Sequence, residues 1–344
     1  MEGRVTNDAH CYANEQWAFI QDCQDTIIGK IIDKFPDYLP MVMEARVTVS
    51  AFPRKLATEF PPMYTNSLIP ICEKLESDIP VLSLGRYGSL QLKDRPSDDA
   101  FVAMFDSAEK SIRLTLQDLG PVCIPGTKTP LPGCRWPKEY LSAFARAIWL
   151  KGVDVEIVLS NPGSVPGGLK PLEACYGNGW SCVDVAAEII KRLRKQFPEA
   201  DDDQVRQKIT DNLRICFIRR EYGNTWADDL TIAMHSKHFI IDDICTYVGS
   251  QNLYICDLAE WGVFIDDADE TKKIMEKYWN PMWKYSFTGE DCKVQDVLDG
   301  QNVNRDNDDS TQTAEVAANT GVKPTDHNLY GDSDDDEEDS DLEA

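Results

Sequence analysis

From about residue 80 onward, short apolar runs alternate with segments whose apolar residues recur every three or four positions. Short apolar runs rich in β-branched residues are typical of buried strands, and they occur at 80–84, 111–120, 153–160 and 213–219. The helical period is clear after Ser97, a predicted N-cap, where Phe101, Met104, Phe105 and Ala108 share one face. Further helices are predicted over 138–152 and 183–197. This alternation indicates an α/β fold.

The pattern changes near residue 238, where two short strands follow each other closely. Residues 238–242 and 245–249 predict a hairpin, and 261–266 predicts one more strand. The last helix is expected to begin at Asp267, with Glu270 as its capping partner, and to end before Pro281. The strands and helices of residues 80–292 are therefore expected to form one folded lobe.

The two ends of the chain differ from this lobe. Residues 1–79 contain a helix-like stretch at 13–35 and then a proline-rich, irregular connector. Residues 301–344 carry fourteen of the chain's acidic residues against two basic ones, which accounts for half of the net charge of −24. We expect residues 293–344 to form an acidic, disordered tail that solvates the protein or serves as a docking or phosphorylation segment at Ser333 and Ser340.

Composition limits the possible partners and compartments. The sequence has no basic stripe, so a nucleic-acid partner is not expected. It shows neither a signal peptide nor an apolar stretch long enough to cross a membrane, and the localisation stays unknown. None of the eleven cysteines forms a C-x-x-C pair, which leaves buried free thiols or a few disulfides as alternatives.

The richest chemistry lies between residues 234 and 252. On an extended strand His235 and Lys237 would share a face, whereas His238 would point the other way. A neutral imidazole beside an ammonium suits phosphate chemistry, and Ser250 and Asn252, presented after Gly249, can donate further hydrogen bonds. An imidazole also needs a carboxylate that fixes its tautomer, for which Asp242 is one candidate, although it lies in a turn.

A lone H-x-K is typical of a surface strand, but the full string H-x-K-x-x-x-x-D followed by G-S-x-N is far more specific. It resembles the HKD signature of the phospholipase D superfamily, with His235, Lys237 and Asp242 in the motif and Gly249, Ser250 and Asn252 in its continuation. The segments "YVGSQNLYICDLAEWGVFID", "WNPMWKYS" and "VDVEIVLSNPGS" resemble the C-terminal half of secreted phospholipases D of the Streptomyces type. The resemblance implies that residues 80–292 form a phospholipase D-like lobe with a mixed β-sheet flanked by helices.

The resemblance also implies roles for individual residues. Glu260 takes the place of the acidic residue that orients the histidine, which leaves Asp242 a structural role in its turn. Gln117 and Asp118 match a Q-D pair and are expected as scaffold first and as site wall second. The substrate class is a phospholipid phosphodiester such as phosphatidylcholine, and no metal or cofactor is expected.

Only half of the family's site is visible in these residues. Members build one active site from two HKD lobes, yet the sequence contains no second H-x-K. Residues 1–23 loosely resemble the stretch after a first HKD motif, so we expect residues 1–79 to be a remnant of the N-terminal lobe, with the first motif upstream of Met1. His235 would then be the acid/base half. The alternatives are a single-motif, nuclease-type homodimer and a non-catalytic lipid- or protein-binding module.

Overall fold

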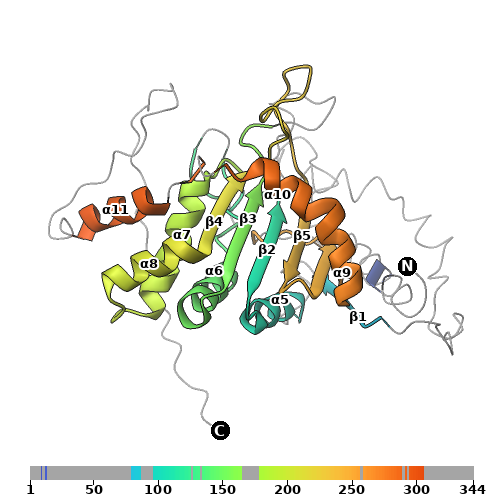
Figure 1. Cartoon of the computed structure of the whole chain (residues 1–344), viewed down its shortest axis with the longest axis horizontal. Helices are drawn as coiled ribbons and strands as arrows, with labels where there is room; N and C mark the ends of the chain where they lie inside the picture. The colour runs from blue at the N-terminus through green and yellow to red at the C-terminus, as the bar shows by residue number, and fades with distance from the viewer. Residues whose placement is uncertain are drawn as a thin grey trace, which may run out of the picture. The chain divides into compact units, whose positions relative to one another are not determined.

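A seven-stranded mixed β-sheet forms the centre of the molecule (Figure 1). The computed structural model describes residues 9, 12–13, 79–86, 96–124, 127–131, 134–164, 178–255, 259–288, 291–292 and 294–305. The strands are β1 (Val81–Arg86), β2 (Ser111–Leu116), β3 (Asp154–Leu159), β4 (Leu213–Phe217), β5 (Lys237–Ile241), β6 (Cys245–Gly249) and β7 (Glu260–Asp266). The α/β class and the mixed, helix-flanked sheet expected from the sequence are therefore confirmed.

The strand order is β1-β7-β6-β5-β2-β3-β4. Strand β2 pairs parallel with β3 and antiparallel with β5, and β3 pairs parallel with β4. Strands β5 and β6 form the predicted antiparallel hairpin, and β7 pairs antiparallel with both β6 and β1. As a result, β5 and β7 run opposite to the other five strands, so the starts of these two strands meet the ends of β1, β2 and β6 at one edge.

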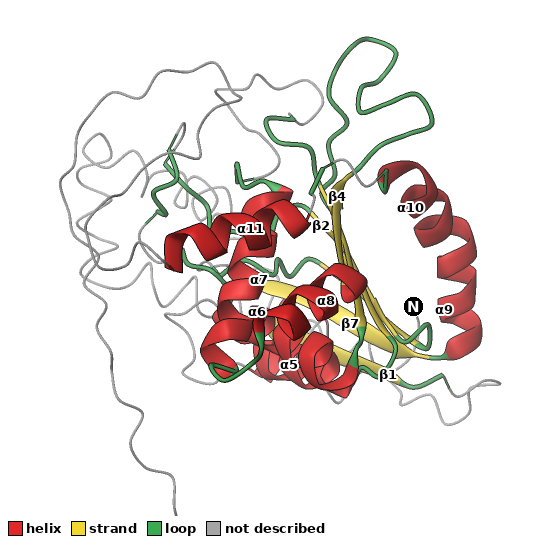
Figure 2. Ribbon diagram, turned by 60° about the vertical axis from the view of Figure 1, so that its left-hand side comes forward, coloured by secondary structure: helices red, strands yellow, loops and turns green. Residues whose placement is uncertain are grey.

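Helices cover both faces of the sheet (Figure 2). One face carries α5 (Pro96–Ser107), α6 (Lys138–Arg146) with η2 (Ala147–Lys151), α7 (Cys182–Gln196) and α8 (Asp202–Asn212). The other face carries α9 (Ala268–Ile274), η3 (Met275–Trp279) and α10 (Asn280–Ser286). The last helix of the described chain is α11 (Val294–Arg305).

Aromatic residues dominate the larger core, between the sheet and α5–α8. Phe101 is fully buried, and its ring centroid lies 5.0 Å from that of Phe239 and 4.7 Å from that of Tyr247. Phe105 packs edge-on against Phe144 at 4.8 Å. These rings fix α5 and α6 on strands β5 and β6, the strands that carry the HKD-like motif.

Several element boundaries differ from the sequence expectation. Ser97 is not the N-cap of its helix: α5 begins at Pro96, and the Ser97 hydroxyl instead donates to Gln251 Oε1. Asp267 does cap α9, because its side chain accepts from Glu270 N at 2.8 Å. The predicted helix end before Pro281 is wrong, because a π-helical turn precedes this proline and places it in the first turn of α10, where a missing N–H is tolerated.

The expected start of the acidic tail at residue 293 is also wrong. Residues from Val294 onward form α11, and Val294, Val297 and Leu298 are buried in the main core. The first compact unit of the chain ends at Asn302, and a second unit runs from Val303 to Ala344. The expectations for residues 306–344, and those for residues 1–78 apart from 9, 12 and 13, lie outside the described residues.

Two further sequence questions have structural answers within the described chain. No described helix is long and apolar enough to span a bilayer. The described cysteines are free thiols, namely Cys123, Cys134, Cys182, Cys216, Cys245 and Cys292.

Candidate active site

Side chains with phosphate chemistry gather where the ends of β1, β2 and β6 meet the starts of β5 and β7. Lys237 is the first residue of β5, and Glu260 is the first residue of β7. Gln117 directly follows β2, and Arg86 is the last residue of β1. The strand directions therefore bring together residues that are up to 174 positions apart in the chain.

Lys237 lies at the centre of this edge and is 7% exposed. Its Nζ donates to Gln117 Oε1 at 3.1 Å and to the carbonyl oxygen of His235 at 3.2 Å. Burial lowers the pKa of Lys237 to about 8, although the carboxylate of Glu260 opposes that shift. Gln117 therefore contacts Lys237, and its roles as scaffold first and as site wall second stay predictions.

His235 precedes β5 and is exposed at the same edge. Partial burial lowers the pKa of its imidazole, and the nearby charge of Lys237 lowers it further. A neutral imidazole is therefore favoured near pH 7, in the state that accepts a proton from water or an alcohol.

His238 lies on the opposite face of β5, as the alternation of the strand predicts. Its Nε2 is 2.9 Å from Thr246 Oγ1, and its ring packs edge-on against Tyr278 at 5.2 Å. Burial alone lowers the pKa of His238 to about 4. This histidine is a neutral part of the packing between the sheet and the C-terminal helices, and it does not belong to the candidate site.

Asn252 and Glu260 are held together at this edge. Glu260 Oε1 accepts from both the backbone N and Nδ2 of Asn252, each at 2.8 Å, and Glu260 Oε2 accepts from Arg86 Nη1 at 2.6 Å. Burial raises the pKa of Glu260, against the lowering effect of Arg86 and of the two Asn252 hydrogen bonds. The bonds described for this carboxylate run to Arg86 and Asn252, so its role in orienting His235 stays a prediction.

Sequence reasoning missed a buried network behind Glu260. Arg86 is 6% exposed and lies between Glu260 and Asp98, with Nη2 2.5 Å from Asp98 Oδ1. Tyr140 and Gln251 complete the network, and both donate to Asp98. A charged residue at the end of an apolar strand was the one available signal for Arg86, but it did not reveal which carboxylates the residue contacts.

Gly249 and Ser250 shape the connection that carries Asn252. A Cβ atom on Gly249 would lie 2.7 Å from the Cα of Gly262 and would also collide with the Tyr247 ring. The backbone N and the Oγ of Ser250 both donate to the carbonyl oxygen of Trp261, at 2.9 Å and 3.2 Å. Ser250 therefore ties β6 to β7, whereas the sequence suggested a donor to phosphate.

Asp242 and Asp118 hold loops. Asp242 lies at the far end of β5 with a φ of 54°, and its carboxylate accepts from the backbone N–H groups of Glu109, Lys110 and Ser111 at 2.9, 2.7 and 2.8 Å. Asp118 accepts from the N–H groups of Leu119 at 2.6 Å and Gly120 at 2.9 Å, and burial raises its pKa to about 6. Both carboxylates stabilise backbone turns.

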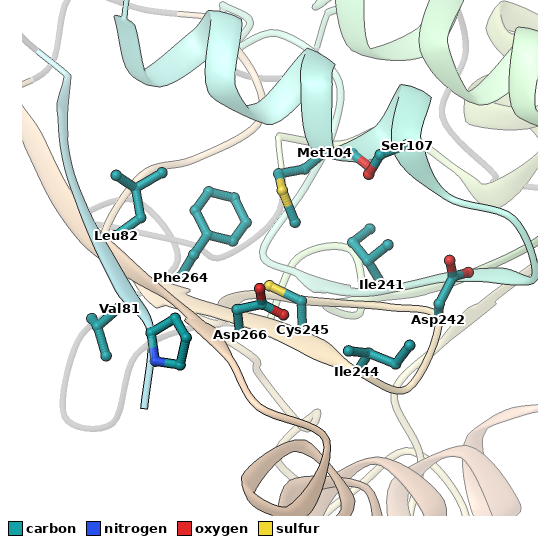
Figure 3. Close-up of a pocket in the computed structure, with 11 residues that line it drawn as sticks. Val81, Leu82, Met104, Ser107, Ile241, Asp242, Ile244, Cys245, Phe264 and Asp266 are labelled. Atoms are coloured by element: carbon teal, nitrogen blue, oxygen red, sulfur yellow. The ribbon is translucent and has the colours of Figure 1, made fainter. Parts of the chain in front are cut away.

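A cavity of about 550 Å³ lies at the opposite edge of the sheet (Figure 3). Its walls include Leu82, Met104, Ile241 and Phe264, and Asp266 lies among them beside Cys245. This cavity is mostly apolar and lies at the other end of β5 and β7 from Lys237 and Glu260. Within the described residues, no group of three or more His, Cys, Asp or Glu side chains is arranged to hold a metal ion.

Comparison with known proteins gives one informative sequence relative. The chain is 28% identical over 193 residues to phospholipase D of Streptomyces antibioticus, a match that covers 56% of this chain and 32% of that enzyme. The chain thus spans about a third of the length of this relative. No protein-family model matches the sequence.

Looser similarity extends to solved structures. Nuc from Salmonella typhimurium, a phospholipase D family member, aligns with a TM-score of 0.33 and 15% identity over 60% of this chain and 97% of its own. Phosphatidylserine synthase of Haemophilus influenzae aligns with a TM-score of 0.38 and 16% identity over 79% of this chain and 55% of its own. The sequence relative confirms the resemblance of this chain to phospholipases D of the Streptomyces type.

Proposed function

We propose that this chain carries the acid/base half of a phospholipase D-like phosphodiesterase that acts on phospholipid head groups. The observation that supports this most directly is the placement of Lys237 beside His235 at one edge of the sheet. The acidic composition of the chain argues against a nucleic-acid substrate, since a basic groove would be needed to bind one.

The described residues divide the chemical work among themselves. Lys237 supplies positive charge for the non-bridging oxygens of a phosphodiester. Asn252 Nδ2 has two hydrogens, and its bond to Glu260 uses one, which leaves the other for a phosphate oxygen. In its protonated form His235 donates a proton to the head-group oxygen as this group leaves, and the neutral imidazole that results then accepts a proton from the attacking water.

The nucleophile in this scheme is a histidine outside the described site. It would form a bond to phosphorus as the bond from phosphorus to the head-group oxygen breaks, and water would later release phosphatidate from it. A second HKD lobe would supply this histidine, either from a longer form of the protein or from a partner chain. An acceptor alcohol in place of water would give transphosphatidylation.

A choline-release assay on phosphatidylcholine vesicles, run beside a measurement of molar mass in solution, tests the need for a second lobe. We expect the 344-residue chain to release little or no choline. A dimer that turns over phosphatidylcholine and loses this activity in His235→Ala would overturn the two-lobe requirement and support a self-sufficient homodimer.

A further inference from the structure

Arg86 uses all of its hydrogen-bond donors inside the protein. A guanidinium has five N–H groups. Nε and Nη2 contact Asp98 Oδ1 at 3.2 and 2.5 Å, and Nη2 also contacts Tyr140 Oη at 3.1 Å. Nη1 contacts Glu260 Oε2 at 2.6 Å and the carbonyl oxygen of Asn252 at 2.8 Å. No donor is left for a substrate phosphate, so Arg86 can influence the site only through the groups that it holds.

Arg86 forms an ion pair with Glu260, and the negative charge of Glu260 acts on Lys237. Asp98 faces Arg86 from α5, Tyr140 from α6 and Glu260 from β7. Arg86 lowers the pKa of Glu260, which burial raises, and the Glu260 carboxylate opposes the loss of the Lys237 proton. His235 is the other charged or titratable neighbour described at Lys237, and its coupling to Lys237 is repulsive when both are protonated.

Tyr12, near the N-terminus, contacts Arg86 and Gly85 and so completes the Arg86 clamp, which we define as Arg86 with Asp98, Tyr140 and Glu260. The hydroxyl of Tyr12 donates to the carbonyl oxygen of Arg86 at 2.7 Å, and the Tyr12 ring covers Gly85, where a Cβ atom would lie 2.6 Å from the ring. Backbone and side chain of Arg86 are therefore held from two sides.

We propose that Arg86 is a positioning residue of the phosphodiesterase site: its guanidinium holds the Glu260 carboxylate in place against Asn252, and this carboxylate, at the start of β7, is the counter-charge of Lys237 at the start of β5. This inference rests on the proposed function for its purpose, but the relay from Arg86 to Lys237 is a property of the folded protein without substrate.

When Arg86 is removed, the relay and a direct effect of the Arg86 charge predict opposite changes in the pKa of Lys237. Removal of the Arg86 cation would by itself reduce repulsion and raise the pKa of Lys237. In the relay, the same removal frees the Glu260 carboxylate from its place against Asn252, and Lys237 then loses the counter-charge that was held there. We therefore expect the pKa of Lys237 to fall in Arg86→Gln, in the direction that the loss of a nearby opposite charge produces.

The pKa of Lys237 can be measured by competitive labelling of lysines with acetic anhydride from neutral to alkaline pH. The extent of labelling is read from the peptide that contains Lys237. The variants are Arg86→Gln, Arg86→Lys, Glu260→Gln and the double Arg86→Gln/Glu260→Gln. A control is Arg113→Gln, which breaks another arginine–carboxylate contact, to Glu156 at 2.9 Å, in the body of β2.

We expect Arg86→Gln and Glu260→Gln to lower the pKa of Lys237, Arg86→Lys to retain most of the wild-type value, and Arg113→Gln to leave it unchanged. A rise or no change in folded Arg86→Gln overturns the proposal. If circular dichroism shows that Arg86→Gln does not fold, the other two variants decide. An unchanged pKa of Lys237 in Glu260→Gln would overturn the relay. A pKa of Lys237 in Arg86→Lys that is as low as in Glu260→Gln would overturn it as well. Titration without substrate separates this result from the presence or absence of turnover.

Discussion

At the scale of single residues, strand β5 shows how position alone separates a proposed catalytic lysine from a structural histidine. Lys237 and His238 are neighbours, yet Lys237 reaches the polar edge beside His235 while His238 is enclosed by Thr246 and Tyr278. Burial lowers the pKa of both, to about 8 and about 4 respectively. Only Lys237 keeps a charge near pH 7 that a phosphodiester would feel.

The lowered pKa of Lys237 predicts a pH dependence of stability. The folded value of about 8 lies below the ordinary lysine value of about 10.4, so the unfolded chain binds more protons between these two pH values. This group therefore makes the free energy of unfolding rise with pH through that window. Urea unfolding of the wild type and Lys237→Met should show a difference between the two proteins that changes in this direction from pH 8 to 10; a constant difference would contradict the burial of a charged Lys237.

Asp242 belongs to the HKD-like motif but should behave as a stability residue. Its carboxylate satisfies three consecutive backbone N–H groups, so we expect Asp242→Ala to lower the free energy of unfolding by about 2 kcal/mol. Denaturant unfolding measures the loss. The neighbouring Asp243→Ala, at a similar φ of 60°, removes only an exposed ion pair to Arg113 and is the control, so it should cost clearly less than Asp242→Ala. The Lys237 titration should be the same in both variants.

At the scale of elements, the sequence predicted the features that follow from the local spacing of apolar and polar residues. It did not predict contacts between side chains that are far apart in the chain. The β5–β6 hairpin and the cap at Asp267 follow from local pattern and are confirmed. Ser97 looked like an N-cap, but its hydroxyl bonds to Gln251, 154 positions away, which no local pattern can show. The Arg86 clamp was missed for the same reason, since its partners come from α5, α6 and β7.

The β6–β7 pair is the element that should tolerate substitution least. Gly249 and Gly262 face each other in register, and a Cβ on either would collide with Tyr247. We expect Gly249→Ala to destabilise the fold by about 1–3 kcal/mol through overpacking. Gly300→Ala is the control, because nothing lies within 4 Å of a Cβ there. Equal thermal midpoints for the two variants would contradict the close approach of β6 and β7.

Helix α11 was expected to belong to a disordered tail, and its packing can be tested directly. Leu298 is 3% exposed, so Leu298→Ala should cost about 2–4 kcal/mol if the helix is part of the core. The control is Leu150→Ala, at a leucine that is 62% exposed. If urea unfolding shows that Leu298→Ala loses no more free energy of unfolding than Leu150→Ala, then α11 is not part of the core.

At the scale of the whole molecule, the mixed sheet works as a frame with two different edges. Lys237, Glu260 and Arg86 lie at one edge, and the turn at Asp242 and the apolar cavity lie at the other. The α/β class could be predicted because it follows from local patterns along the chain. The sequence could not supply the opposing wall of the site, for which the chain offers no second H-x-K.

In the proposed function, His235 and Lys237 form a phosphodiester-binding half-site. The most direct measurement is a titration with monomeric dihexanoylphosphatidylcholine, followed by the NMR signals of the histidine rings. We expect a saturable shift of the His235 signals in the wild type and in Lys110→Met, a control at an exposed lysine, with His238 unchanged. Lys237→Met should weaken this binding by about tenfold or more, since it removes a charge-assisted contact to phosphate. A His235 signal that does not respond, or that responds equally in Lys237→Met, would contradict the account.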